Sequence, residues 1–220
     1  MLTVSTSFSY NRGVDSAPSY HHGNLRETLL DAAAKLVAEG GPGAFTLREV
    51  ARRVGVSHNA PYRHFKDRDE VMAAVAAQGF ERLTAAMRRS AAKGATALER
   101  FRLCGRGYIA FALRWPEHFL IMFDLPSRVE GYPEYAAAAR EAFEVLRESI
   151  EAAQNDRVLS PGDPEPMALV AWALVHGIAK LATSGRLPFR AARVLEFASY
   201  GESVLMEGLV RASHPGAFLK

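Results

Sequence analysis

Hydrophobic residues recur every three or four positions along most of this chain, which is the period of an α-helix with one buried face. Leu47, Val50, Ala51 and Val54, for example, fall at i, i+3, i+4 and i+7. The same period predicts a first helix capped by Asn24 and further helices over residues 67–92, 97–114, 117–123, 134–153, 165–183 and 189–211. Prolines and glycines separate these segments. The pattern predicts an all-α protein.

Two of the helix signals lie on either side of a tight turn between Thr46 and Phe65. Thr46 with Glu49 three residues later forms a capping-box pattern, which starts a helix. Gly55 supplies the left-handed residue that commonly ends a helix. Ser57 is a good N-cap for a second helix running to about Phe65. A helix, a glycine turn and a helix form the outline of a helix-turn-helix.

The second helix carries polar groups where a recognition helix meets base edges, and Pro61 is tolerated there because first-turn amides lack intrahelical partners. Six basic and two acidic residues between positions 46 and 68 give a local charge of +4, against +3 for the whole chain. The basicity therefore marks one patch, suited to a polyanion. A chance outline with a merely solvated arginine face is the alternative. The residues expected to contact DNA are Thr46, Arg48, Ser57, His58, Asn59, Ala60, Tyr62, Arg63, His64 and Lys66.

Residues 24–77, which include Gly55 and the run from Tyr62 to Lys66, resemble the N-terminal DNA-binding domain of the tetracycline-repressor (TetR) family of transcriptional regulators. The resemblance implies that Thr46 and Arg48 approach DNA from the first helix of the pair. It also implies that residues 57–60 lie in the major groove and that Tyr62, His64 and Lys66 contact phosphates. The family varies most at groove-facing positions, so no operator sequence follows.

Three segments follow from these observations. Residues 1–22 lack a sustained period and are interpreted as a flexible arm. Residues 23–70 form the helix-turn-helix head, with three helices. Residues 71–215 form a helical bundle for effector binding and dimerisation, and the helix over residues 67–92 links it to the head.

An aromatic-rich stretch from residue 98 to 123 is a candidate lining for an effector pocket between helices. Aromatic residues at helical spacing are more often ordinary core, and that alternative stays open. The family resemblance favours an effector site in this region, for a largely apolar small molecule whose identity is not determined. The candidate pocket residues are Cys104, Tyr108, Phe111, Trp115, His118, Phe119, Met122, Trp172 and His176.

The last two predicted helices carry apolar stripes suited to a four-helix interface between two copies of the chain. The Trp172-x-x-x-His176-Gly177 pattern resembles the C-terminal region of one TetR subfamily. Burial of both helices within one subunit is the alternative. The residues expected at the dimer interface are Ala168, Ala171, Trp172, Val175, Leu195, Ala198, Glu202 and Leu205.

Composition narrows the classes of protein to which the chain could belong. The chain has 220 residues, 49% of them hydrophobic, and a single cysteine, so an internal disulfide is excluded and a reducing, cytoplasmic compartment is expected. No run reaches the roughly 20 apolar residues that span a bilayer, so we expect no membrane insertion. Neither a cofactor nor a metal is expected. The alternatives are two other classes of protein: a helical scaffold that does not bind DNA, and an enzyme using Cys104 with His118 or His176.

The sequence therefore predicts a homodimeric, all-helical repressor that binds a double-stranded DNA operator. A small, largely apolar effector would tilt the helix over residues 67–92 and move the heads out of register.

Overall fold

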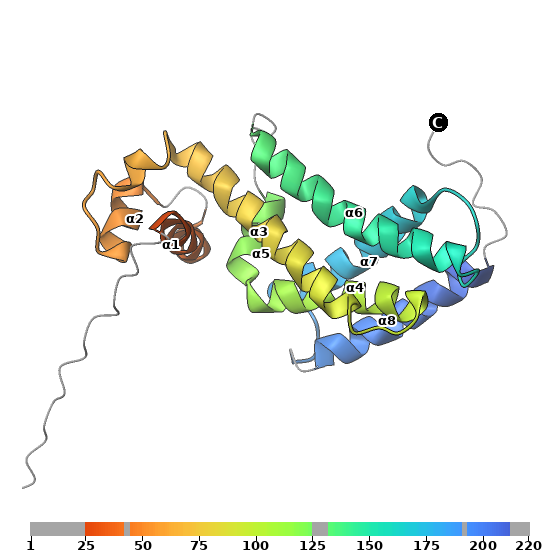
Figure 1. Cartoon of the computed structure of the whole chain (residues 1–220). Coiled ribbons are helices and arrows are strands. Elements are labelled where there is room, and N and C mark those ends of the chain that lie inside the picture. The colour runs from red at the N-terminus through yellow and green to blue at the C-terminus, as the bar shows by residue number, and fades with distance from the viewer. Residues whose placement is uncertain (1–24, 42–44, 125–131, 191–192, 212–220) are drawn as a thin grey trace, which may run out of the picture.

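Every regular element in the described part of the chain is helical, which confirms the all-α prediction. The computed structural model describes residues 25–41, 45–124, 132–190 and 193–211. In Figure 1 the first helices form a small head, and α3 leads from it into a larger bundle. The predicted arm (residues 1–22), the Asn24 cap and residues 212–215 lie outside the described residues. The elements are α1 (Leu25–Gly40), α2 (Leu47–Val54), the 3-10 helix η1 (Pro61–Arg63), α3 (Arg68–Ala91), α4 (Ala97–Arg114), α5 (Pro116–Asp124), α6 (Pro133–Asn155), α7 (Pro164–Thr183) and α8 (Val194–Arg211).

Three helices of the bundle begin at a proline: α5 at Pro116, α6 at Pro133 and α7 at Pro164. Proline suits the first helical position because the amide there has no intrahelical acceptor. The Asp163 carboxylate caps α7 by accepting from the Glu165 amide at 3.0 Å. The sequence therefore predicted the start of each of these helices one residue too late, because a proline usually interrupts a helix.

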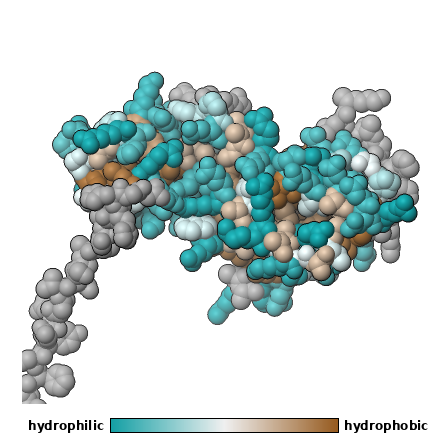
Figure 2. All heavy atoms as spheres, viewed as in Figure 1, coloured by the Kyte–Doolittle hydropathy of each residue, from teal (hydrophilic) through white to brown (hydrophobic). Residues whose placement is uncertain are grey.

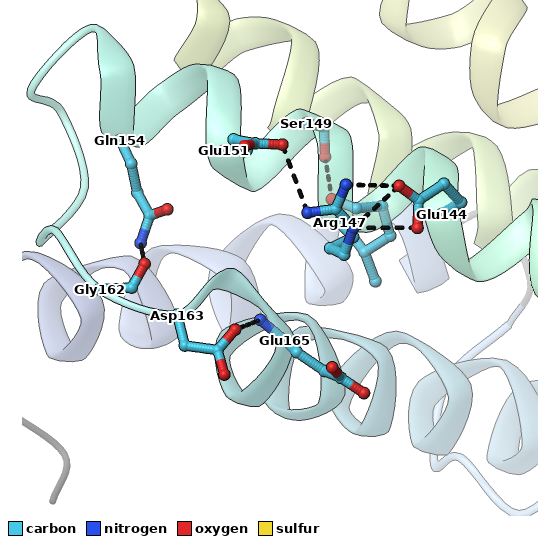
Figure 3. A network of polar contacts seen from close by, with 9 residues as sticks. Glu144, Arg147, Ser149, Glu151, Gln154, Gly162, Asp163 and Glu165 are labelled. Carbon is cyan, nitrogen blue, oxygen red and sulfur yellow. Dashed lines mark hydrogen bonds and ion pairs between the residues drawn. The ribbon is translucent and has the colours of Figure 1, made fainter. Parts of the chain in front are cut away.

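The connection between α6 and α7 is held by a polar network, drawn in Figure 3. The Gln154 amide donates to the backbone carbonyls of Ser160, at 2.9 Å, and Gly162, at 3.3 Å. On α6 the Arg147 guanidinium contacts the carboxylates of Glu144 and, at 3.3 Å, Glu151. The bonds from Gln154 fix the loop, which lies at the end of the bundle farthest from the head (Figure 1).

Two hydrophobic clusters divide the molecule, and α3 belongs to both. The head cluster takes α3 residues from Val71 to Ala76, whereas the bundle cluster begins at Ala77 and continues to Met87. Ile121 of α5 packs into the head cluster although α5 lies in the bundle. By packing, the head therefore ends near residue 76, a turn and a half beyond the predicted boundary at residue 70.

The helix α5 lies against α3 at a glycine. A Cβ at Gly79 would approach the Met122 sulfur to 2.5 Å, so the absence of a side chain permits the close contact between the two helices. Through this contact and Ile121, α5 touches the bundle and the head at once.

The last two helices differ from the expectation in two respects. α8 begins at Val194 rather than at residue 189, because Phe189 instead packs against Phe197, with ring centroids 5.2 Å apart. By length and composition, α7 is the one helix among the described residues that could cross a membrane. Its inner face, with Ala168, Ala171 and Ala179, is buried in the bundle cluster.

Candidate functional site

The first helix of the turn motif forms as its local signals predict. The Thr46 hydroxyl accepts from the Glu49 amide at 3.2 Å, which starts α2. Gly55 ends α2 with φ +78°, and its amide and that of Val56 donate to Arg52 and Ala51 respectively. These two bonds form a Schellman-type ending, which requires the left-handed residue that glycine provides.

The predicted second helix from Ser57 to Phe65 is wrong in its conformation. The segment is a turn followed by the 3-10 helix η1, and its backbone bonds join Ala60 to Ser57 at 2.9 Å and His64 to Pro61 at 2.9 Å. Pro61 has no N–H, so it cannot form the bond to the Ser57 carbonyl that would close an α-helical turn. The Ala60 amide takes that carbonyl instead, in the i to i+3 pattern.

The structure places all ten predicted DNA-contacting residues at the surface of the head. Nine are exposed and Ala60 is half-buried. Tyr62 is 53% exposed, which is unusual for an aromatic ring and leaves its hydroxyl accessible to a partner. Beneath them Pro61 and Phe65 are buried, so the segment is anchored by two apolar residues and presents its polar ones.

The cationic patch is smaller than the sequence count suggests. Arg53 donates two 2.8 Å hydrogen bonds to the Glu39 carboxylate on α1, and Arg52 lies 3.4 Å from Glu49. Arg68 stacks over the Phe45 ring at 5.2 Å. Among the described residues, the cations of the motif that contact neither an acidic side chain nor an aromatic ring are Arg48, Arg63 and Lys66. These three are the charges available to a polyanion.

The bundle contains a cavity of about 400 Å³, a volume suited to a small molecule. Only Tyr108 and Trp172 of the nine predicted pocket residues line it. His176 and Phe119 lie behind Tyr108, Phe111 is packed in the core, and Met122 lies against α3. The lining residues are Phe80, Leu83, Met87, Tyr108, Phe123, Tyr135, Ala139, Ala142, Phe143, Leu146, Leu169 and Trp172.

A chain of hydrogen bonds supports one wall of this cavity. The Trp172 indole N–H lies 3.3 Å from the Tyr108 oxygen, and that oxygen lies 2.9 Å from Nδ1 of His176. An indole N–H can only donate, so the Tyr108 oxygen accepts from it and has its own proton to give to His176. Burial raises the pKa of Tyr108, so the phenol stays protonated at neutral pH.

Cys104 does not support the enzyme alternative. Its side chain is buried, and burial raises the pKa of the thiol to about 12. The thiolate is the nucleophilic form of cysteine, so this group is unreactive at neutral pH. Cys104 lines a separate space of about 40 Å³, which has room for little more than ordered water.

Trp115 and His118, both predicted in the pocket, lie instead at the junction of head and bundle. Arg82 of α3 is the centre of that junction: it lies 2.9 Å from Asp31 of α1, 4.5 Å from the Trp115 ring centroid and 3.2 Å from Nε2 of His118. The pKa of His118 falls to about 4, first because it is buried and second because of the charge on Arg82. Sequence periodicity placed His118 on the short helix that is α5 and left Trp115 just before it, but could not tell which neighbour each one faces.

Two family models match the chain in succession. Residues 29–75 match the model of bacterial regulatory proteins of the tetR family, and residues 101–200 match a tetracyclin repressor-like C-terminal domain. The solved structure of a protein with unknown function from Rhodococcus sp. RHA1 is 34% identical, with a TM-score of 0.75 over 89% of this chain and 100% of that one. The chain belongs to the TetR family of transcriptional regulators.

Other TetR-type relatives share one part of the chain or the fold. A 47-residue segment is 43% identical to the HTH-type transcriptional repressor Rv3405c of Mycobacterium tuberculosis, and it covers 21% of this chain and 25% of the repressor. The chain thus matches about a quarter of that relative's length. The transcriptional regulator FadR of Bacillus subtilis, solved in complex with stearoyl-CoA, has a TM-score of 0.69 at 14% identity over 86% of this chain and 100% of FadR, a likeness of fold alone.

The unpartnered apolar surface of this TetR-family chain lies on α7 and α8. Ala168, Ala171 and Ala198, predicted at the dimer interface, are buried inside the subunit, and Trp172 lines the cavity. Val175, Glu202 and Leu205 border the small space beside α4, so of the eight only Leu195 is exposed. Apolar residues occur on all faces of α7 itself. Hydrophobic periodicity alone therefore could not distinguish the face that packs inside the subunit from the face that is exposed. The large exposed apolar residues of these helices are Val170, Leu181, Leu195, Phe197, Tyr200 and Val204.

Proposed function

We propose that this protein is a DNA-binding transcriptional repressor whose head contacts an operator through the corner between α2 and η1. The observation that carries the proposal is the arrangement at this corner: nine exposed residues, which include a tyrosine and three cations without an acidic partner among the described residues, all on a rigidly capped turn motif. Base edges require exposed polar donors, and phosphates require cations beside them. In Figure 2 hydrophilic side chains dominate the visible surface of the head.

The repressor acts as a homodimer through the exposed apolar face of α7 and α8. Exposed apolar patches of this kind mark interaction surfaces. Gly177 lies on α7 between Val170 and Leu181, and a Cβ there would meet nothing within 4 Å, which leaves space for a close approach by a partner helix. A two-fold dimer would place its heads at half-sites one helical turn apart, roughly 34–36 Å.

The effector binds in the cavity and changes the position of the head through α3 and α5. Phe80 of α3 and Phe123 of α5 line the cavity, with ring centroids 5.4 Å apart. The same two helices enter the head cluster through Val75 and Ile121. A ligand that displaces these rings would therefore move both connections to the head, with a coupling of typically about 1–3 kcal/mol.

The test uses two head variants and a duplex selected from random DNA. Asn59→Ala should reduce discrimination between the selected and a scrambled duplex, because a groove-facing amide is lost. Lys66→Ala should weaken both duplexes alike and lower the salt slope by about one unit, because one phosphate contact is lost. Lys93→Ala, which removes an exposed cation from the loop after α3, is the matched control and should change neither.

Fluorescence anisotropy at four salt concentrations gives the affinity for each duplex, the discrimination between the two duplexes and the dependence of affinity on salt. If wild-type protein binds the duplexes without preference and Lys66→Ala behaves like Lys93→Ala, the head does not read DNA. The scaffold alternative would then be favoured. If the effects of Asn59→Ala and Lys66→Ala are exchanged, DNA binding stands but the assignment of base and phosphate contacts is wrong.

A further inference from the structure

The cavity between α3, α4, α5, α6 and α7 has a lining that discriminates by charge. None of the twelve described residues that line it is an acid, a lysine, an arginine or a histidine. Its polar groups are the hydroxyls of Tyr108 and Tyr135 and the indole N–H of Trp172. A carboxylate, phosphate or ammonium group placed here would lose its water and gain no opposite charge, a loss that these few dipoles do not repay.

One hydrogen-bonding position remains at the polar wall. The Tyr108 oxygen has two lone pairs, of which one accepts from Trp172, and we assign its proton to Nδ1 of His176, which is the tautomer with an unprotonated Nδ1. The position left over is therefore an acceptor. It matches a ligand that donates, such as a hydroxyl, and not one that only accepts, such as an ether.

The other walls are built from aromatic edges and faces. Phe80 meets Tyr135 at 5.7 Å and 73°, and Phe143 meets Trp172 at 6.3 Å and 78°, both edge-to-face. Such walls offer faces and edges that stack on a flat ring. A cavity of about 150 Å³ holds benzene, so about 400 Å³ accommodates two or three fused rings, or about 15 non-hydrogen atoms.

The apolar space beside this cavity, next to α4, is too small to compete. It measures about 40 Å³, and the Arg102–Glu202 ion pair, at 3.3 Å, lies at its edge. Those charges are already paired with each other, so this space offers no counter-charge to a ligand in the larger cavity.

We propose that the cavity takes an uncharged fused-ring compound of about 15 non-hydrogen atoms with one hydrogen-bond donor directed at Tyr108. This inference rests on the proposed effector-responsive function and specifies its ligand class. It excludes free carboxylates placed inside the cavity, because the anionic group has no partner among the described lining residues.

The test compares three naphthalene compounds of matched shape on the full-length protein by isothermal titration calorimetry. 2-Naphthol is neutral and donates, 2-methoxynaphthalene is neutral and only accepts, and 2-naphthoate is anionic. We expect 2-naphthol to bind at least about tenfold more tightly than 2-naphthoate and measurably more tightly than the ether. Tyr108→Phe should remove the advantage of 2-naphthol over the ether and leave the preference for neutral compounds unchanged.

Two further variants locate the binding. Ala139→Trp, at a half-buried lining position, should abolish 2-naphthol binding by filling the cavity, and Ala142→Trp should do the same from the buried neighbouring turn. Ala110→Trp, at an exposed position on α4, is the matched control and should bind normally. Unchanged binding in both folded lining variants would overturn the assignment of the cavity.

The outcomes separate this inference from the function on which it rests. If 2-naphthoate binds as tightly as 2-naphthol, or if only anionic compounds release the protein from its selected duplex, the ligand class is wrong and the effector-responsive function stands. If 2-naphthol binds in the cavity but operator affinity is the same at saturation, the ligand class stands and the proposed effector response fails.

Discussion

His118 makes the stability of the junction between head and bundle dependent on pH. Its side chain is 2% exposed, and Nε2 lies 3.0 Å from the Gln78 oxygen and 3.2 Å from the Arg82 guanidinium. Burial and the positive charge of Arg82 lower the pKa of His118 from 6.5 to about 4. The folded protein therefore holds this imidazole neutral at pH values where the unfolded chain protonates it.

The direction and size of the effect follow from linkage. Between pH 6.5 and 4 the unfolded state binds more protons at this site, so stability is complete above pH 6.5 and falls as the pH approaches 4. From pH 8 to pH 5 the two pKa values give a loss of about 2 kcal/mol in the free energy of unfolding from this group alone. This loss already includes the repulsion by Arg82, which raises the cost of protonating His118, and the attraction to Asp31, 3.6 Å away, which lowers that cost.

The assay is urea unfolding of wild type and His118→Gln at pH 8, 6.5 and 5. The chain has seven histidines, so other groups contribute to both proteins, and only the difference between their pH profiles reports His118. We expect wild type to lose about 2 kcal/mol more than His118→Gln between pH 8 and pH 5. Parallel profiles would refute the reasoning, because they would mean that His118 is protonated as easily in the folded state as in the unfolded one.

Three further predictions concern other parts of the molecule. Gly177→Trp should shift the protein from dimer to monomer in analytical ultracentrifugation with its melting temperature little changed, since a Cβ at this position meets nothing within 4 Å inside the subunit; a dimer as tight as wild type would exclude this face. Thr46→Ala should cost about 1 kcal/mol in urea unfolding, because the 3.2 Å cap to the Glu49 amide is lost; an unchanged midpoint would contradict the role of the cap. Arg82→Met should reduce the ratio of operator affinities without and with effector, because it removes the 2.9 Å contact to Asp31 between bundle and head; a ratio equal to that of wild type would place the coupling elsewhere.

Local signals were the most reliable part of the sequence. Thr46 and Gly55 act on nearby backbone groups, so the cap and the turn that they form could be predicted directly. The prediction of an α-helix after Ser57 was wrong, because it took account only of the fact that the first turn of a helix tolerates a proline such as Pro61. Its missing N–H also removes a bond, and the segment tightens into η1.

Positions that depend on packing between distant helices were harder to predict. Of the residues predicted for the pocket, Tyr108 and Trp172 line the cavity, whereas Trp115 and His118 face the head. Helical spacing assigns a residue to a face of its helix but does not say which other helix covers that face. Half of the ten missed lining residues, such as Phe143, lie on α6, and the others lie on α3, α5 and α7.

The account depends most on the claim that two heads read one duplex in register. Purified full-length protein should be mixed with random duplex DNA, and the retained fragments sequenced. We predict an enriched inverted repeat whose half-sites are centred about 10 base pairs, or a multiple of a helical turn, apart. Retained fragments with the same composition as the input, and no repeated half-site, would contradict it.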